Sequence, residues 1–340
     1  MQKLTKAPIY LYVNTESKEN QELIFLNSMK AAHKKANKAV EDFYFSQEQT
    51  TLKGVRTSQC ANAVVFKHYI LPDEYKLDKI NLCRDRLCLN CQLAQSRKLI
   101  RKLIWAVEHI KLHSGDTLQF LTLTAPNVPA EKIREQTQNL IKASKAFLRK
   151  FNIVDYFRSV EITCNKKLPK DKRYHPHLHF VFIAPQNTKF PLFDKTLGKY
   201  GANPLQFAWA QKWADITNQT VETLGTNKKT GQKGPYLAAT VYPITDKKSI
   251  FELTKYITKP QDMTKNVIAD LYGKNFDNMT DTGITGLRLK TPCGQFKELF
   301  NRFNICKALD DEMEKQRLSE LDYELLSYIY NGEVYELWNK

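Results

Sequence analysis

The chain has 340 residues, 42% of them hydrophobic, and 52 lysines and arginines against 36 acidic residues, a formal net charge of +16. This length and apolar content exclude wholesale disorder and allow one large or two ordinary domains, and the excess positive charge favours a polyanionic partner. No run of 18 apolar residues and no signal-like N-terminus occurs, so we expect a cytoplasmic protein with no membrane partner.

Two amphipathic helices are predicted in the first third of the chain. Residues 19–47 and 92–113 both repeat apolar side chains at helical spacing, and the second carries its arginines and lysines largely on the opposite face. With nearby basic residues, this helix is a candidate DNA-binding surface, although a basic helix face exposed to solvent explains the pattern equally well. The predicted DNA-binding residues are Arg84, Arg86, Arg97, Lys98, Arg101, Lys102, Lys228, Lys229 and Lys233.

Four cysteines lie between these helices. Cys60, Cys83, Cys88 and Cys91 are separated by 22, 4 and 2 intervening residues. In an intracellular chain such cysteines are metal-bound or reduced more often than disulfide-bonded, and four thiolates can close a tetrahedral structural Zn²⁺ site. The last three form the stronger part of the pattern, and His68 competes with Cys60 as the fourth ligand. Cys164, Cys293 and Cys306 are isolated, which is typical of core thiols.

The middle of the chain alternates strands and helices. This order predicts an α+β fold in which helices pack on an antiparallel sheet. The predicted strands are residues 119–124, 156–164, 177–184, 220–224 and 237–242, and the predicted helices are residues 129–150, 204–217 and 246–259.

The end of the chain is predicted to be mostly helical from about residue 300, and it is acidic. Nine acidic and three basic residues follow from Asp310 onward, which leaves a net charge of +22 on residues 1–309. A solvated acidic helix is the simpler interpretation of this segment, and a segment that limits non-specific DNA binding is the alternative.

Three histidines alternate along one predicted strand. His175, His177 and His179 therefore project from the same face, and paired imidazoles on a sheet commonly hold a divalent metal. A hairpin centred near residue 169 would set Glu161, the acidic residue of the preceding strand, opposite His177. This donor set suits Mg²⁺ or Mn²⁺ with water and phosphate completing the shell. Exposed polar positions on a half-solvated strand are the alternative for both the histidines and Glu161.

The helix predicted over residues 246–259 carries a second candidate site. Glu252 and Tyr256 are four residues apart and share a face, and Lys259 follows three residues later. A tyrosine hydroxyl can attack a phosphodiester covalently, with a carboxylate beside it as general base. By itself this pattern is more typical of a structural helix, and it gains meaning beside the histidine strand.

Four segments together resemble a known family. They are CRDRLCLNCQLAQSRK, FLTLTAPNV, the pair VEITCNKK and YHPHLHFVF, and ELTKYITK, and they extend from Cys60 to about Asp262. The chain resembles the rolling-circle replication initiators of small Gram-positive plasmids, in the HUH endonuclease superfamily. The resemblance implies a five-stranded antiparallel sheet with flanking helices, of ferredoxin/RRM-like type. From this resemblance together with the element order, we expect three consecutive segments: a helical zinc-knuckle region at residues 1–115, the endonuclease domain at 116–270 and a mostly helical, acidic segment at 271–340.

The resemblance also implies roles for particular residues. Glu161, His177 and His179 match the metal ligands, Tyr256 the nucleophile, Glu252 the residue that activates water in the terminating cleavage, and Lys259 the lysine after the tyrosine. His175 has no role in the pattern.

A chain of this family would bind the double-strand origin of its plasmid, where an extruded hairpin presents the nick site unpaired. Cleavage would leave a 5′-phosphotyrosine and a 3′-hydroxyl that primes the host polymerase. A host helicase is a further implied partner, and a homodimer on the DNA is allowed for.

Three other functions fit parts of the sequence. An HUH transposase or relaxase would use the same chemistry. A histidine-triad nucleotide hydrolase would use His175, His177 and His179 with a histidine nucleophile. A non-enzymatic zinc DNA-binding regulator would need neither the histidine strand nor Tyr256.

Overall fold

The computed structural model describes residues 32–71, 74–165, 167–170, 173–186, 209, 212–217, 239–244, 265–272, 283–319 and 321–338. Contacts divide the chain into a first unit, residues 1–91 and 316–340, and a second unit, residues 92–315. This division differs from the three consecutive segments expected at 1–115, 116–270 and 271–340, because the last 25 residues pack with the N-terminal part of the chain.

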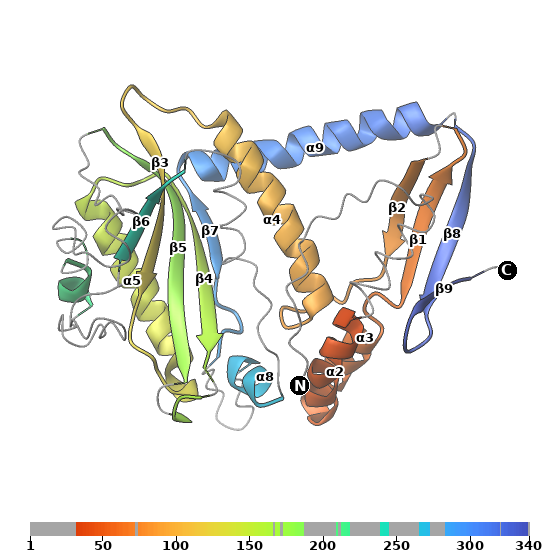
Figure 1. Cartoon of the computed structure of the whole chain (residues 1–340), viewed down its shortest axis with the longest axis horizontal. Helices are drawn as coiled ribbons and strands as arrows, with labels where there is room; N and C mark the ends of the chain where they lie inside the picture. The colour runs from red at the N-terminus through yellow and green to blue at the C-terminus, as the bar shows by residue number, and fades with distance from the viewer. Residues whose placement is uncertain are drawn as a thin grey trace. The chain divides into compact units, whose positions relative to one another are not determined.

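The first unit combines two helices with a four-stranded antiparallel sheet (Figure 1). Its helices are α2 (Ala32–Phe45) and α3 (Thr51–Ser58), joined by the short 3-10 helix η2 (Glu48–Thr50). Its sheet has the order β2 (Glu74–Ile80), β1 (Ala63–Tyr69), β8 (Tyr323–Tyr330) and β9 (Tyr335–Leu337). Val64 and Phe66 of β1 pack against Tyr328 and Tyr335 to form its core. The β-branched and aromatic content of β1 and β8 explains why both segments form strands.

The strands β8 and β9 correct the prediction that the chain is mostly helical from about residue 300. The helix α9 (Gln295–Ser319) fulfils the prediction as far as Ser319, and the chain then turns into strands. The acidic composition suggested a solvated helix, but alternate residues Leu326, Tyr328 and Tyr330 pack on one side of β8.

The second unit is built on a five-stranded antiparallel sheet with the order β6, β3, β5, β4, β7. The predicted α+β class with helices on an antiparallel sheet is confirmed. The strand β7 was not predicted, and the predicted strand 220–224 and helix 246–259 lie outside the described residues. The strands are β3 (Thr117–Thr124), β4 (Tyr156–Cys164), β5 (Tyr174–Ala184), β6 (Ala239–Pro243) and β7 (Lys290–Cys293).

Helices cover both faces of this sheet (Figure 1). On one face, Leu103 of α4 (Leu89–His109) and Phe296 of α9 pack against Phe157 of β4 and Val181 of β5. On the other face, α5 (Ile133–Lys150) packs along β5. The remaining described elements are η3 (Ala130–Lys132) and α8 (Lys265–Tyr272). Among the described residues, no helix is both long and apolar enough to cross a bilayer.

Truncating the core under α4 should destabilise the second unit. Leu103 is 1% exposed within this core, so we expect Leu103→Ala to lower the free energy of unfolding by about 2–5 kcal/mol. Leu112→Ala is the matched control, because Leu112 is 44% exposed, and its effect should stay within about 0.5 kcal/mol. Urea denaturation followed by tryptophan fluorescence measures both. Equal losses from the two variants would contradict the packing described here.

Candidate functional site

The hairpin of β4 and β5 places the candidate metal ligands. Glu161 pairs with His177 across the two strands, as the sequence predicted from a hairpin centred near residue 169. His175 and His179 lie two residues to either side of His177, so all three imidazoles share the face to which Glu161 belongs. This is also the face on which α4 and α9 pack further along the strands.

The side chain of His179 is held by contacts to two neighbouring strands. Its Nε2 lies 2.9 Å from Oε2 of Glu161, and its Nδ1 lies 3.1 Å from Oγ1 of Thr122 on β3. The imidazole also stacks on the ring of Phe120, with 5.7 Å between the centroids. The His179 side chain is only 5% exposed, so these contacts fix both the position and the orientation of the imidazole.

The other two histidines form a row with His179. The ring centroids of His175 and His177 are 4.0 Å apart, and those of His177 and His179 are 6.1 Å apart. Burial lowers the pKa of His177 to about 3, and the His175 and His179 rings add to this effect. Burial also lowers the pKa of His175. Both side chains are therefore mainly neutral at pH 7, and a neutral imidazole offers the lone pair that a metal ion needs.

The donor set of this row fits a divalent cation with open coordination positions. The imidazoles of His177 and His179 and the Glu161 carboxylate provide nitrogen and oxygen donors. The hydroxyl of Ser159, which pairs with His179 across the hairpin, is buried without a hydrogen-bond partner among the described residues. The donor atoms of the histidines and Glu161 are spread more widely than the four cysteine sulfurs. Among the described residues, those sulfurs form the one group of three or more metal-ligating side chains whose donor atoms lie within 4.8 Å of one another. Water and a substrate phosphate could complete the shell of a Mg²⁺ or Mn²⁺ ion here.

The four predicted cysteines form a buried cluster in the first unit. Their sulfur atoms lie within 4.8 Å of one another, and three of the sulfur pairs are 3.5–3.7 Å apart. Sulfurs bound at about 2.3 Å to a tetrahedral zinc ion are about 3.8 Å apart, so the spacing matches a structural zinc site. The alternative ligand His68 lies elsewhere, with its Nδ1 2.6 Å from Oε1 of Glu324.

Hydrogen bonds from N–H groups surround the sulfur atoms. The backbone N–H groups of Cys83, Arg84 and Asp85 donate to the sulfurs of Cys60, Cys91 and Cys83 at 3.4, 3.1 and 3.4 Å. The Asn37 amide donates to the Cys88 sulfur at 3.2 Å and accepts from the backbone of Leu89 at 2.8 Å. Donors around sulfur stabilise thiolates, which are the form that binds zinc.

The titration of the thiols also reflects their crowding. Hydrogen bonds with the Cys60 thiol and the other two thiols lower the pKa of Cys83 and raise the pKa of Cys88. The four sulfurs therefore do not all ionise together by themselves. A divalent cation would allow all four to bind as thiolates.

The predicted DNA-binding residues differ in their surroundings. Arg84 and Arg86 are exposed beside the cysteine cluster, and Arg84 adopts a left-handed backbone conformation with φ of 61°. Arg97, Lys98 and Arg101 are exposed on α4, as expected. Lys102 is half-buried, and its ammonium lies 5.7 Å from the centre of the Phe300 ring. Lys102 therefore contributes to the packing of α4 on α9.

The predicted catalytic helix cannot be placed, because it lies outside the described residues. The residues Tyr256, Glu252 and Lys259, predicted to be catalytic, and the predicted DNA-binding residues Lys228, Lys229 and Lys233 all lie outside the described residues.

The sequence analysis did not identify two residues that hold candidate metal ligands in position. Thr122 holds the His179 ring, and Asn37 holds the Cys88 sulfur. Strand alternation could have placed Thr122 on a polar face, but its partner depends on the pairing of β3 with β5. Nothing in the sequence distinguishes Asn37 from other polar residues of its helix.

Comparisons with known proteins identify a family. The profile of a family described as Rep_1, replication protein, matches residues 74–332. A protein of Bacillus sp. named "Protein rep" is 24% identical over 274 residues, covering 78% of this chain and 85% of its own length. A "Protein rep" of Lentilactobacillus hilgardii is 27% identical over 318 residues, covering 84% and 88%. One from Staphylococcus aureus is 29% identical over 198 residues, covering 57% and 76%. No solved structure gives a significant match.

Removing one cysteine of the cluster should abolish zinc binding. Because Cys88 is fully buried among the other three thiols, we expect Cys88→Ser to reduce bound zinc from about one ion per chain to well below that, and to unfold the first unit in part. Cys306→Ser is the control, since Cys306 is an exposed free thiol, and it should keep its zinc. Metal content by mass spectrometry measures both variants. Full zinc content in Cys88→Ser would refute the assignment.

Proposed function

This chain belongs to the Rep_1 family of replication proteins, and we propose that it initiates rolling-circle replication of a plasmid by nicking one strand of the origin DNA. The observation that carries the proposal is the β4–β5 register, which pairs Glu161 with His177 while Glu161 contacts His179 at 2.9 Å. A carboxylate and two imidazoles on one sheet face suit metal-assisted chemistry at a phosphodiester. The HUH endonuclease fold is part of this proposal.

Glu161, His177 and His179 would hold the catalytic Mg²⁺ or Mn²⁺. When bound, such a cation neutralises charge on the scissile phosphate and makes its phosphorus more electrophilic. The chain prepares the site by keeping His177 neutral through burial and by fixing the His179 ring between Glu161 and Thr122. Ligands held this firmly lose little entropy when they bind an ion.

We assign the covalent step to Tyr256. Its phenolic oxygen attacks the phosphorus, the bond from phosphorus to the 3′-oxygen breaks, and the departing oxygen takes up a proton to become a 3′-hydroxyl. The 5′-phosphate stays on the tyrosine, and the free 3′-hydroxyl primes the host polymerase. Lys259 steadies the phenolate by its charge. In the terminating cleavage Glu252 removes a proton from the attacking water.

The origin DNA would be held mainly through its phosphates. The net charge of +22 on residues 1–309 and the exposed Arg84, Arg86, Arg97, Lys98 and Arg101 support this part of the proposal. The cysteine cluster, with a bound Zn²⁺, would keep Arg84 and Arg86 at fixed positions beside it. A host helicase would act on the strand that nicking frees.

The nucleophile can be tested directly. Full-length protein is incubated with Mn²⁺ and single-stranded origin oligonucleotide labelled 3′ of the nick, and the products are separated on a denaturing gel. Wild type should cut the strand and retain the label, whereas Tyr256→Phe should do neither, because it lacks the attacking oxygen. If the wild-type protein binds DNA tightly but forms no covalent protein–DNA adduct, a zinc-containing DNA-binding regulator would be the better-supported function.

The histidine row provides a second test. We expect His179→Ala to lower the nicking rate by about 10²-fold or more, since it removes a metal ligand and the partner of Glu161. His175→Ala should stay within a few-fold of wild type in the same assay. If His175→Ala abolished activity and His179→Ala did not, a histidine-triad mechanism would be favoured instead.

A further inference from the structure

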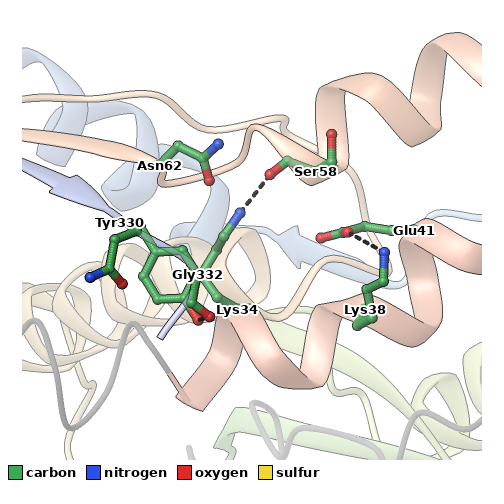
Figure 2. A pocket seen from close by; sticks show the side chains of 8 residues that line it. Lys34, Lys38, Glu41, Ser58, Asn62, Tyr330 and Gly332 are labelled. Atoms are coloured by element: carbon green, nitrogen blue, oxygen red, sulfur yellow. Dashed lines mark hydrogen bonds and ion pairs between the residues drawn. The ribbon is translucent and has the colours of Figure 1, made fainter. Parts of the chain in front are cut away.

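A pocket of about 490 Å³ lies within the first unit (Figure 2). This volume falls within the range of about 300–1,000 Å³ that is typical of ligand sites. Its walls come from α2, the end of α3, the segment before β1 and the turn between β8 and β9. The lining residues are Lys34, Lys38, Glu41, Ser58, Asn62, Tyr330, Asn331 and Gly332.

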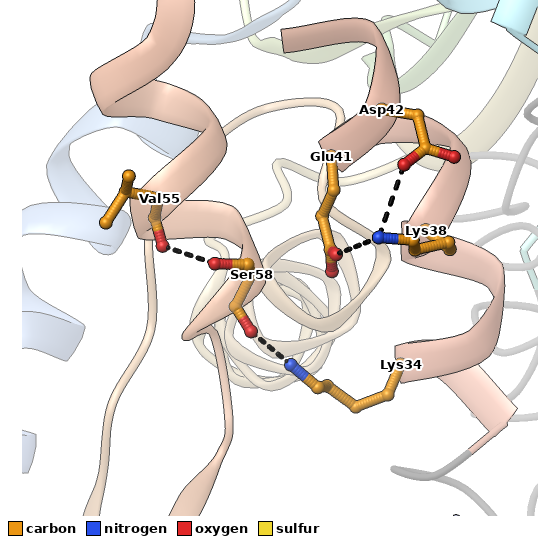
Figure 3. A network of polar contacts seen from close by, with 6 residues as sticks. All are labelled: Lys34, Lys38, Glu41, Asp42, Val55 and Ser58. Atoms are coloured by element: carbon orange, nitrogen blue, oxygen red, sulfur yellow. Dashed lines mark hydrogen bonds and ion pairs between the residues drawn. The ribbon is translucent and has the colours of Figure 1, made fainter. Parts of the chain in front are cut away.

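The charge of Lys34 is the central feature of this pocket. Lys34 is 7% exposed, and its ammonium donates to the backbone oxygen of Ser58 at 2.5 Å (Figures 2 and 3). Among the described residues no carboxylate forms an ion pair with Lys34. An ammonium has three N–H donors, so two remain for a ligand. A buried cation without an ion-pair partner favours an anionic group in the pocket.

The second lysine of the pocket is different. Lys38 is 66% exposed as a side chain, and its ammonium lies 3.6 Å from Glu41 and 3.3 Å from Asp42 (Figure 3). Its charge is therefore balanced by two carboxylates on its own helix. Lys34 has no carboxylate at ion-pair distance among the described residues, although the charge of Glu41 acts on it from further away.

An aromatic ring and an amide lie beside Lys34. The ammonium of Lys34 is 5.6 Å from the centre of the Tyr330 ring. The side-chain amide of Asn62 also lines the pocket and forms no hydrogen bond with another described residue, so it can both donate and accept. A cation, an aromatic face and a free amide are the groups that recognise a phosphate, a stacked base and a base edge.

The wall that carries Tyr330 is ordered before any ligand binds. The Tyr330 hydroxyl donates to the Gly332 carbonyl at 2.7 Å, and the Tyr330 backbone N–H donates to the Asn62 carbonyl at 3.0 Å. The Asn331 side chain accepts from the backbone of Glu333 and Val334 at 2.9 and 3.0 Å. Because the turn is fixed by these bonds, little conformational entropy would be lost on binding.

We propose that this pocket binds one nucleotide, with its phosphate on the Lys34 ammonium and its base against the Tyr330 ring and the Asn62 amide. The nucleotide is either one residue of a single-stranded DNA or a free mononucleotide, which share this chemistry. Its assignment to the DNA rests on the proposed function, because only then does the protein handle unpaired strands. Through this site the first unit would bind the single-stranded DNA directly.

A different role for Lys34 has to be separated from this one. Burial lowers the pKa of the Lys34 ammonium, and the charge of Glu41, followed by those of Cys60, Cys88 and Cys83, raises it. If Lys34 only balanced the charge of the cysteine cluster, its loss would lower zinc content and leave nucleotide binding unchanged per zinc-loaded protein.

The test compares variants of the full-length, zinc-loaded protein. Binding of a labelled single-stranded oligonucleotide is followed by fluorescence anisotropy, and binding of dAMP and dTMP by equilibrium dialysis. Lys34→Met and Tyr330→Leu should each weaken binding by about 10-fold. Lys53→Met is the matched control, because it removes the same charge from α3 outside the pocket, and it should change affinity less than about 2-fold. Zinc content and circular dichroism confirm that each variant is folded.

Photo-cross-linking gives a readout that does not depend on the folding of a variant. An oligonucleotide carrying 5-iodouracil should cross-link wild-type protein at Tyr330, as identified by mass spectrometry of the peptides. Cross-linking blocked by dAMP or dTMP, with dialysis binding of these nucleotides that depends on Lys34, would identify a free mononucleotide as the ligand. Cross-linking without such binding would identify the DNA strand.

Two results would overturn the proposal. They are equal affinities of Lys34→Met and Lys53→Met, and the absence of any cross-link in the peptide containing Tyr330. If wild type nicks the origin strand while either result is found, this inference fails and the proposed function stands. If nucleotide binding depends on Lys34 but the wild-type protein never nicks the origin strand, the proposed function fails and the assignment of a nucleotide site to this pocket remains supported.

Discussion

The register between β4 and β5 is the constraint on which the candidate active site depends. Side chains alternate along a strand, so a slip of one residue would turn Glu161 away from the histidine row. The same face buries Phe157 and Val181 beneath α4 and α9, and these apolar contacts oppose any such slip. Packing at one end of the hairpin thereby positions the polar donors at the other end.

The cysteine cluster has a comparable role in the first unit. Its Cys88 sulfur accepts a hydrogen bond from Asn37 of α2. Two residues after Cys60, the carbonyl of Asn62 accepts a hydrogen bond from the backbone N–H of Tyr330 on β8. Two elements, α2 and the segment between α3 and β1, contribute both to the cluster and to the walls of the pocket containing Lys34. A first unit with so small a sheet has little apolar core, so a bound zinc ion would supply much of its stability. Binding of zinc at the cluster and binding of a nucleotide in the pocket are therefore expected to be coupled in this unit.

The parts of the site that could be predicted are local in sequence. The pairing of Glu161 with His177 follows from a short hairpin, and Cys83, Cys88 and Cys91 lie within nine residues of one another. The pairing of β1 with β8 joins residues more than 250 positions apart, such as Val64 and Tyr328, and no local pattern specifies it. The strand itself left a signal in the alternation of Leu326, Tyr328 and Tyr330, which the acidic composition of the segment obscured. The pocket depends on this distant pairing and could not be predicted either.

We propose that Glu161, His177 and His179 bind a divalent cation together. Pulsed electron paramagnetic resonance on protein whose cysteine cluster is filled with Zn²⁺, and which is then loaded with Mn²⁺, tests it most directly. We expect nitrogen couplings from two imidazoles, which weaken in His177→Gln and in His179→Gln and stay unchanged in His175→Gln. A Mn²⁺ signal with oxygen ligands alone, or nitrogen couplings that none of these variants alters, would contradict it.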